Sequence, residues 1–196
     1  MFEIHITVDT DNVEQFVKDC KELGVKSVIV QMPTKDGKLK TDIMTSSVVH
    51  SEITTIQKYA FNEAKKLKDK GYNVLRVKVE VNANSPLVKT PDLNPDAVYY
   101  ETHFEFETKN PIQEYIVKNF CQYSNTYFSY NVNKCEGDNK VIMLTIRDKK
   151  ISQEDYFKKV ESITSDMKKA LLPLIKVQSE FAVFDSNPEH DNPWLN

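Results

Sequence analysis

Phe2-Glu3-Ile4-His5-Ile6-Thr7-Val8 is closely echoed 98 residues later by Tyr100-Glu101-Thr102-His103-Phe104-Glu105-Phe106. Two further segments return at an offset of 100, in the same order along the chain: Glu14-Gln15-Phe16-Val17-Lys18 as Glu114-Tyr115-Ile116-Val117-Lys118, and Ile43-Met44-Thr45 as Met143-Leu144-Thr145. The sequence therefore predicts an internal duplication, and the duplication places His5 and His103 at equivalent positions.

Composition excludes several classes of protein. The 196 residues carry a net charge of −3, with both signs mixed, so no basic field predicts binding to nucleic acid or membranes. No apolar run is long enough to span a membrane, and the first residues lack the features of a signal peptide. The three cysteines, Cys20, Cys121 and Cys135, form no C-x-x-C motif and suggest no disulfide framework. We expect a cytoplasmic protein.

Alternating strand and helix patterns occur in the same order in both halves of the chain. Asp11 is expected to cap the first helix and Gly24 to end it, while Asn110 and Ser152 are expected to cap the two helices of the second half. Turns are expected at 35–38 and 136–139. Each half reads as β-α-β-β-α-β, the ferredoxin-like pattern.

The predicted fold class is therefore α+β: tandem ferredoxin-like βαββαβ repeats with antiparallel sheets, related by a pseudo-twofold axis. The first repeat would cover residues 1–83, and a proline-containing linker would cover 84–97. The second repeat would cover 98–187. A polar tail, 188–196, contains the only tryptophan, Trp194.

Strand alternation separates an apolar face from a polar face. The apolar side chains of the first strand (Phe2, Ile4, Ile6, Val8) and of the fourth (Leu75, Val77, Val79, Val81) are expected to meet the helices. The opposite face would carry Glu3, His5, Thr7, Arg76, Lys78, Glu80, Glu101, His103, Glu105, Gln178 and Glu180. Two such sheets side by side would form a concave polar groove or a closed tunnel, and we predict a groove.

A plainer interpretation of this polar face stays open. Half-exposed antiparallel sheets ordinarily show polar residues to solvent or to an interface, and cross-strand pairs can simply stabilise each sheet. His50, at a strand end, and His190, in the tail, are interpreted as incidental. Two of the four histidines at one register in both repeats favour a functional role for His5 and His103.

Several segments resemble an uncharacterised family of duplicated bacterial and viral proteins. The segments are the opening strand, Arg76-Val77-Lys78-Val79-Glu80, Tyr99-Tyr100-Glu101-Thr102-His103, and the closing Glu180-Phe181-Ala182-Val183-Phe184-Asp185-Ser186-Asn187 with Trp194. This resemblance covers most of the chain and implies no activity.

Two families of enzymes resemble the layout more loosely. His5-Ile6-Thr7-Val8 matches the His-x-Thr/Ser motif of two-histidine phosphoesterases, whereas His103-Phe104-Glu105-Phe106 keeps the histidine but has Glu105 in place of the hydroxyl residue. The triphosphate-tunnel (CYTH-like) enzymes are similar in their duplicated layout and in Arg76-x-Lys78-x-Glu80. The chain keeps only Glu3 of their opening Glu-x-Glu-x-Lys motif.

The phosphoesterase resemblance implies a metal-independent hydrolase or transferase acting on phosphoesters of the nucleotide or RNA-end type. The residues predicted to be catalytic are His5, His103, Thr7 and Glu105, and those predicted to bind substrate are Arg76, Lys78, Glu3, Glu101 and Glu180. One histidine would act as general base and the other as general acid. The expected ligand is a phosphorylated small molecule or nucleotide, with no cofactor.

Two alternatives remain. Glu3, His5, Glu101, His103 and Glu105 could instead hold a divalent ion, because carboxylates and imidazoles are usable metal ligands. The protein could also be a non-enzymatic ligand- or protein-binding module, and a homodimer is possible, because fold alone does not decide function.

Overall fold

The structure is a computed structural model that describes residues 1–34, 38–89, 98–137 and 139–191. The strands are β1 (Phe2–Asp9), β2 (Lys26–Pro33), β3 (Leu39–Val49), β4 (Asn73–Asn82), β5 (Tyr99–Thr108), β6 (Tyr127–Asn131), β7 (Lys140–Asp148) and β8 (Leu174–Asp185). The helices are α1 (Val13–Leu23), α2 (Ile53–Asp69), α3 (Pro111–Ser124) and α4 (Gln153–Lys169), with short 3-10 turns η1 (Pro86–Lys89), η2 (Val132–Lys134) and η3 (Pro188–Asp191).

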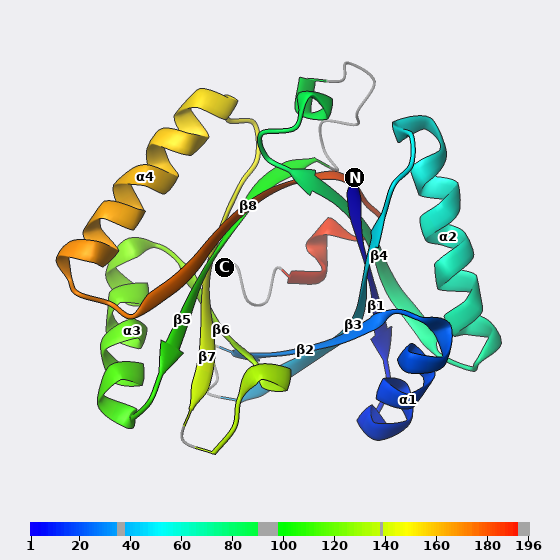
Figure 1. Cartoon of the computed structure of the whole chain (residues 1–196), viewed down its shortest axis with the longest axis horizontal. Helices are drawn as coiled ribbons and strands as arrows, with labels where there is room; N and C mark the ends of the chain where they lie inside the picture. Colours follow the sequence, from blue (N-terminus) through cyan, green and yellow to red (C-terminus); the bar gives the residue numbers. More distant parts are fainter. Residues whose placement is uncertain (35–37, 90–97, 138, 192–196) are drawn as a thin grey trace.

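The strands form one closed antiparallel barrel in the order β1-β3-β2-β6-β7-β5-β8-β4 (Figure 1). The predicted fold class, tandem ferredoxin-like repeats whose open sheets form a groove, is therefore wrong. The β-α-β-β-α-β order of elements does occur twice along the chain, but the two sets of strands join into a single sheet.

Edge pairing between the halves accounts for this closure. β4 pairs with β8 from Lys78↔Asp185 to Asn82↔Glu180, and β2 pairs with β6 at Val30↔Asn131 and Gln31↔Tyr130. An open sheet would leave two rows of backbone N–H and C=O groups unpaired at its edges, and closure removes those edges. The pairing joins residues about 100 positions apart, so local sequence pattern does not reveal it.

The four helices lie outside the barrel, with α1 and α2 on one side and α3 and α4 on the other (Figure 1). The apolar strand faces pack against them, as expected, and form one hydrophobic cluster. Its members include Phe2, Ile4, Ile6, Val8, Phe16, Ile56, Leu67, Val77, Val79, Phe104, Phe106, Val117, Leu144, Tyr156 and Met167. The polar strand faces consequently point to the barrel interior.

Strand register corrects two details. Leu75 was expected in the core but is 37% exposed, because a bulge between Thr7↔Arg76 and Val8↔Val74 makes it the extra residue. His5 pairs with Ser46 and His103 with Thr145, so Ser46 and Thr145 are structural equivalents. The third pair of repeated segments is therefore offset by 99 residues rather than 100.

Three of the four capping residues predicted from the sequence are confirmed. Asn110 accepts a hydrogen bond from the backbone N–H of Gln113, Ser152 accepts one from Asp155, and Gly24 takes the left-handed conformation that ends α1. The cap of α1 is Asn12 rather than Asp11.

The predicted repeats, 1–83 and 98–187, bracket β1–β4 and β5–β8 respectively. Most of the predicted linker, 90–97, lies outside the described residues. So do turn residues 35–37, residue 138, and 192–196 with Trp194.

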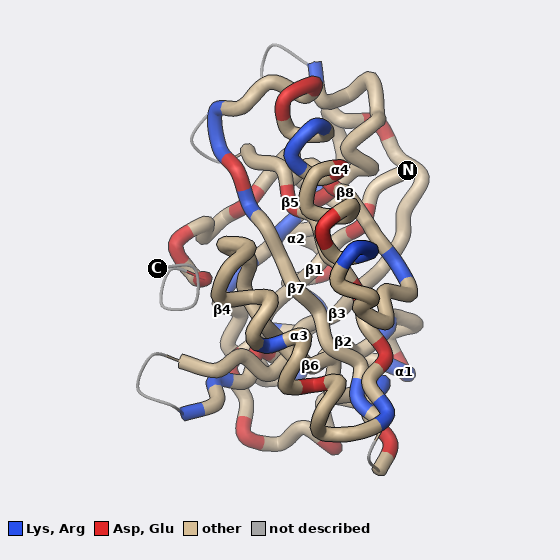
Figure 2. The backbone as a smooth tube through the Cα atoms, turned by 90° about the vertical axis from the view of Figure 1, so that its left-hand side faces the viewer, with Lys and Arg blue, Asp and Glu red and all other residues tan. Residues whose placement is uncertain are grey.

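Lys and Arg residues are interspersed with Asp and Glu residues along the backbone in the side view of Figure 2. Within the described residues, every helix is too short or too polar to span a lipid bilayer.

Candidate functional site in the barrel interior

A cavity of about 220 Å³ occupies the barrel interior. All nine residues that the sequence predicted as catalytic or substrate-binding line it: Glu3, His5, Thr7, Arg76, Lys78, Glu101, His103, Glu105 and Glu180. The prediction found them because strand alternation assigns each to the polar face, and barrel closure brings those faces together.

One side of the cavity is mostly charged, and on the other side apolar side chains alternate with polar ones such as Lys26, Asp42, Ser129 and Arg147. β1, β4, β5 and β8 supply most of the ionisable residues, whereas the opposite strands supply Val28, Val30, Met32, Met44 and Met143. Ligand sites in proteins commonly combine apolar lining with a few convergent polar groups, and a volume of this size suits a compact organic molecule.

Each histidine contacts two glutamates in the same arrangement. His5 Nε2 lies 3.4 Å from Glu3 Oε1 and 3.3 Å from Glu80 Oε2. His103 Nε2 lies 3.1 Å from Glu101 Oε1 and 3.9 Å from Glu180 Oε2. Cross-strand pairing shows the equivalence, because Glu3 opposes Glu80 and Glu101 opposes Glu180.

The second ring nitrogen of each histidine is held by the neighbouring strand. His5 Nδ1 lies 3.2 Å from the backbone oxygen of Thr45, which can only accept, so Nδ1 carries the hydrogen. His103 Nδ1 lies 2.9 Å from the hydroxyl oxygen of Thr145. The two contacts fix the ring planes and aim both Nε2 atoms at carboxylates.

Lys78 connects the two histidine clusters. Its Nζ lies 2.9 Å from Glu80 Oε1 and 3.2 Å from Glu101 Oε1. A continuous series of charged contacts therefore runs from His5 through Glu80, Lys78 and Glu101 to His103. Burial alone would raise the pKa of Glu80, but Lys78 and His5 outweigh it and lower that pKa to about 2. Neither oxygen of Glu80 has a hydrogen bond of good geometry within the described residues.

Glu180 lacks the lysine that its counterpart Glu80 has. Lys78 opposes His5, and the residue opposing His103 is Gln178, which donates a hydrogen bond of 2.6 Å to Glu180 Oε1. Burial, reinforced by the charge of Glu80, raises the pKa of Glu180 to about 7.

Folding also raises the pKa of His103. Burial acts to lower its pKa, but the hydrogen bond and charge of Glu101 outweigh burial and raise it. The Glu180 carboxyl, with its pKa of about 7, lies 3.9 Å from His103 Nε2, and the two groups form a candidate acid–base pair.

We expect Gln178→Lys to move the titration midpoint of Glu180 down by about 1–3 pH units, because an ammonium group would then stand beside its carboxylate as Lys78 stands beside Glu80. Carbon-13 NMR of the labelled Glu180 carboxyl measures this midpoint. Gln178→Met, which has similar length and no charge, should leave it near or above the wild-type value. Equal midpoints in both variants would show that the residue at 178 does not control Glu180.

The end of the barrel that holds Arg76 carries a second network, which sequence reasoning missed. Arg76 donates to Asp185 through Nε and Nη2 and to Asp191 through Nη1, at 3.0, 2.6 and 2.9 Å. Arg147 donates to Glu101 and to the same Asp191. The alternation of β7 could have assigned Arg147 to the interior, but nothing local predicts that the C-terminal segment reaches it.

His190 was wrongly interpreted as incidental. Its Nε2 lies 3.1 Å from Asp42 Oδ2, and its backbone oxygen accepts a hydrogen bond from Lys40 Nζ at 3.2 Å. η3 thereby lies across the interior of the ring of strands (Figure 1). The turn is fixed by side chains from β3, β4 and β7.

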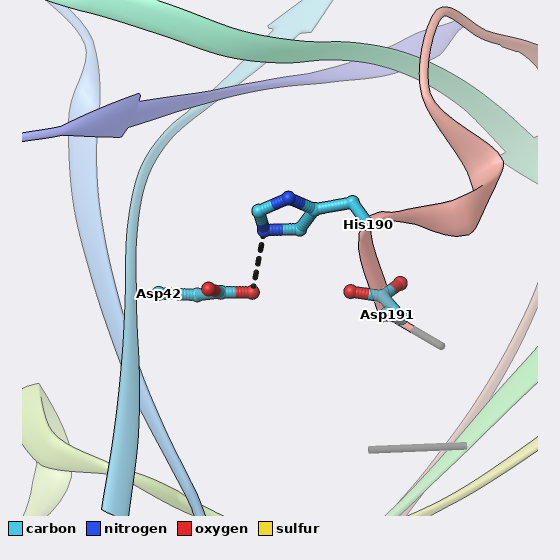
Figure 3. Close-up of side chains that lie close together, drawn as sticks. All are labelled: Asp42, His190 and Asp191. Atoms are coloured by element: carbon cyan, nitrogen blue, oxygen red, sulfur yellow. Dashed lines mark hydrogen bonds and ion pairs between the residues drawn. The ribbon is translucent and has the colours of Figure 1, made fainter. Parts of the chain in front are cut away.

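Asp42, His190 and Asp191 also form the one group in the described part of the chain whose ligand atoms lie close enough to share a metal ion (Figure 3). The set does not fit a metal centre well. Lys40 lies 3.2 Å from Asp42 Oδ1, and two arginines hold Asp191. The predicted alternative set around His5 and His103 is likewise interleaved with Lys78 and Arg147.

A second cavity, of about 470 Å³, lies at the other end of the barrel, where β1 begins and β4 ends. It shares Glu3, Glu80, Lys176, Gln178 and Glu180 with the interior cavity. Glu180 therefore lines both cavities, and the second one reaches it from the end opposite to η3.

No protein-family model and no curated protein matches the sequence. Several solved structures align weakly. An anthrone oxidase-like protein has 11% identity, a TM-score of 0.31, and covers 94% of this chain and 91% of its own. A proposed monooxygenase of Fusobacterium nucleatum subsp. nucleatum has 10% identity and a TM-score of 0.31, and the alignment covers 92% of this chain and 89% of that protein. A heme-binding protein of Thermus thermophilus has 8% identity and a TM-score of 0.27, and the alignment covers 92% of this chain and 90% of that protein. Likenesses this low carry no argument about function.

The description of the protein as ferredoxin-like and phosphoesterase-like is wrong. It rested on two separate lobes facing each other across a groove, and the chain forms one closed barrel. Glu105, predicted to be catalytic, is held by Lys134 at 2.7 and 2.9 Å from its two carboxylate oxygens.

Proposed function

We propose that the barrel binds a compact, partly apolar organic molecule and transfers protons to and from it through Glu180 and His103. The proposal is supported by the position of this pair, in which Glu180 has a pKa of about 7, in a cavity that also contains the apolar side chains of Val28, Val30 and Met44. A general acid or base is most effective when its pKa lies near the working pH.

Other residues of the cavity supply charge, orientation and apolar contact for this proton transfer. Glu80 is charged, and its two oxygens contact Lys78 and His5, so it holds both side chains at the cavity lining. Lys78 and Glu101 hold His103 in place and supply the local charge balance. Val28, Val30 and Met44 provide apolar contact and exclude water from the reacting groups.

Phosphoester cleavage by the same histidines remains a prediction of the sequence, and the charges do not favour it. Each imidazole lies between two glutamates, and carboxylates at that distance would repel a phosphate. Three further expectations also stay predictions: that the protein uses no cofactor, that it can form a homodimer and that it is cytoplasmic. Three free cysteines support a reducing compartment.

Proton transfer can be tested without knowing the physiological substrate. A panel of compact keto acids, hydroxy acids and cyclic ketones would be incubated with the protein in deuterium oxide, and NMR would follow replacement of C–H by C–D. We expect the wild type to accelerate exchange for at least one compound, and Glu180→Gln to lower that rate about 100-fold or more. Glu161→Gln, on the exposed face of α4, is the matched control.

Two outcomes would decide against the proposal. Equal exchange rates for wild type and Glu180→Gln would remove Glu180 from the chemistry. Binding of compounds without any exchange would instead support the non-enzymatic ligand-binding alternative.

A further inference from the structure

The interaction of Asp191 with two arginines resembles the way a protein holds the carboxylate of a ligand. Arg76 Nη1 and Arg147 Nη2 converge on the same oxygen, Asp191 Oδ2, at 2.9 and 2.5 Å. Both arginine side chains are buried, at 5% and 6% exposure. Paired buried guanidinium groups are the usual means of recognising a planar carboxylate.

The contact with Asp191 leaves one donor unused. Arg147 Nη1 is buried and has no hydrogen-bond partner within the described residues. Arg147 therefore meets Asp191 through a single nitrogen, although a guanidinium can donate two parallel bonds to one carboxylate. A buried donor without a partner is costly, so a carboxylate that engaged Nη1 and Nη2 together would bind better than Asp191 does.

The position of Arg147 is fixed independently of Asp191. Its Nε donates to Glu101 Oε2 at 2.7 Å, and its guanidinium stacks over the ring of Tyr99 at 4.2 Å. Arg76 is held in the same way by Asp185 and by the hydroxyl oxygen of Tyr99. The two arginines would therefore keep their arrangement if the Asp191 side chain turned away.

We propose that Arg76 and Arg147 form a carboxylate-binding site which Asp191 occupies from within the chain, and that the ligand of the barrel is a small organic acid whose carboxylate replaces Asp191. Replacement of one carboxylate by another leaves the charge that faces the two arginines unchanged. Val30 and Met32 line the same cavity and would contact the apolar part of the acid. This inference rests on the proposed use of the interior as a ligand site and names the chemical class of that ligand.

The test measures binding of benzoate and butyrate to the full chain by isothermal titration calorimetry. Removal of the internal competitor in Asp191→Ala should tighten binding at least about 10-fold relative to wild type, because a good charged hydrogen bond contributes about that much. Benzamide and butyramide, which have the same shape without the charge, should show no such gain. Arg147→Met added to Asp191→Ala should abolish the gain.

Asp191→Asn is the second variant, because it keeps the size of the side chain if Asp191→Ala folds poorly. If both variants are folded by circular dichroism and bind benzoate no more tightly than wild type, the proposal is overturned. Equal gains for benzamide and benzoate would also overturn it, by showing that the mutation only opens space. Neither outcome depends on proton exchange at Glu180, so failure here is separable from failure of the proposed function.

Discussion

Replacement of Arg76 by methionine is expected to lower the free energy of unfolding by about 3–5 kcal/mol. Arg76 is 5% exposed, and three of its nitrogens donate to Asp185, Asp191 and Tyr99. Its removal would leave Asp185, which is 4% exposed, as a buried carboxylate without its cation. Urea unfolding followed by circular dichroism at pH 7 measures the loss.

Pseudo-symmetry supplies a matched control for this substitution. Lys176 opposes Glu105 as Arg76 opposes Thr7, but Lys176 is exposed. Lys176→Met should therefore change stability by about 0.5 kcal/mol or less. The double variant Arg76→Met with Asp185→Asn should recover part of the loss. A loss below about 1 kcal/mol for Arg76→Met would mean that the network does not hold this end of the barrel together.

Glu180→Gln is expected to stabilise the protein at pH 8 by up to about 3 kcal/mol while leaving it unchanged near pH 4. The pKa of Glu180 is raised by folding from 4.5 to about 7. Protonated Glu180 favours the folded state, so its contribution is fully present below pH 4.5 and is lost as the pH rises through 7. Glutamine cannot ionise and avoids that loss.

Glu80→Gln should act in the opposite direction. Folding lowers the pKa of Glu80 to about 2, so the charged carboxylate stabilises the folded state above pH 4.5 and stops doing so as the pH falls through 2. We expect a loss of about 2–3 kcal/mol at pH 7. Unfolding curves of both variants from pH 4 to pH 8 test the pair together. Parallel curves for wild type and Glu180→Gln would contradict the raised pKa.

The sequence predicted which residues share a face much better than it predicted how the faces meet. His5 and His103 were located by repetition and alternation, both of which are local properties of the chain. Ser152 and Asn110 were likewise identified as caps because capping depends on a few neighbouring residues. Each of these signals lies within one element.

The errors involve residues far apart in sequence. Barrel closure depends on β2 with β6 and β4 with β8, and either edge could equally well have faced solvent. The partnership of Asp191 with Arg76 and Arg147 requires η3 to reach the barrel interior, which no periodicity indicates. The exposure of Leu75 follows from a bulge, and one inserted residue in a ladder leaves no mark in hydrophobic alternation.

Two equivalent glutamates acquire different protonation states because Lys78 accompanies Glu80 and Gln178 accompanies Glu180. Carbon-13 NMR titration of the Glu80 and Glu180 carboxyl groups in the wild-type protein tests this difference most directly. We predict a midpoint near 7 for Glu180 and one near 2 for Glu80. Two midpoints that both lie near the ordinary value of 4.5 would contradict the account.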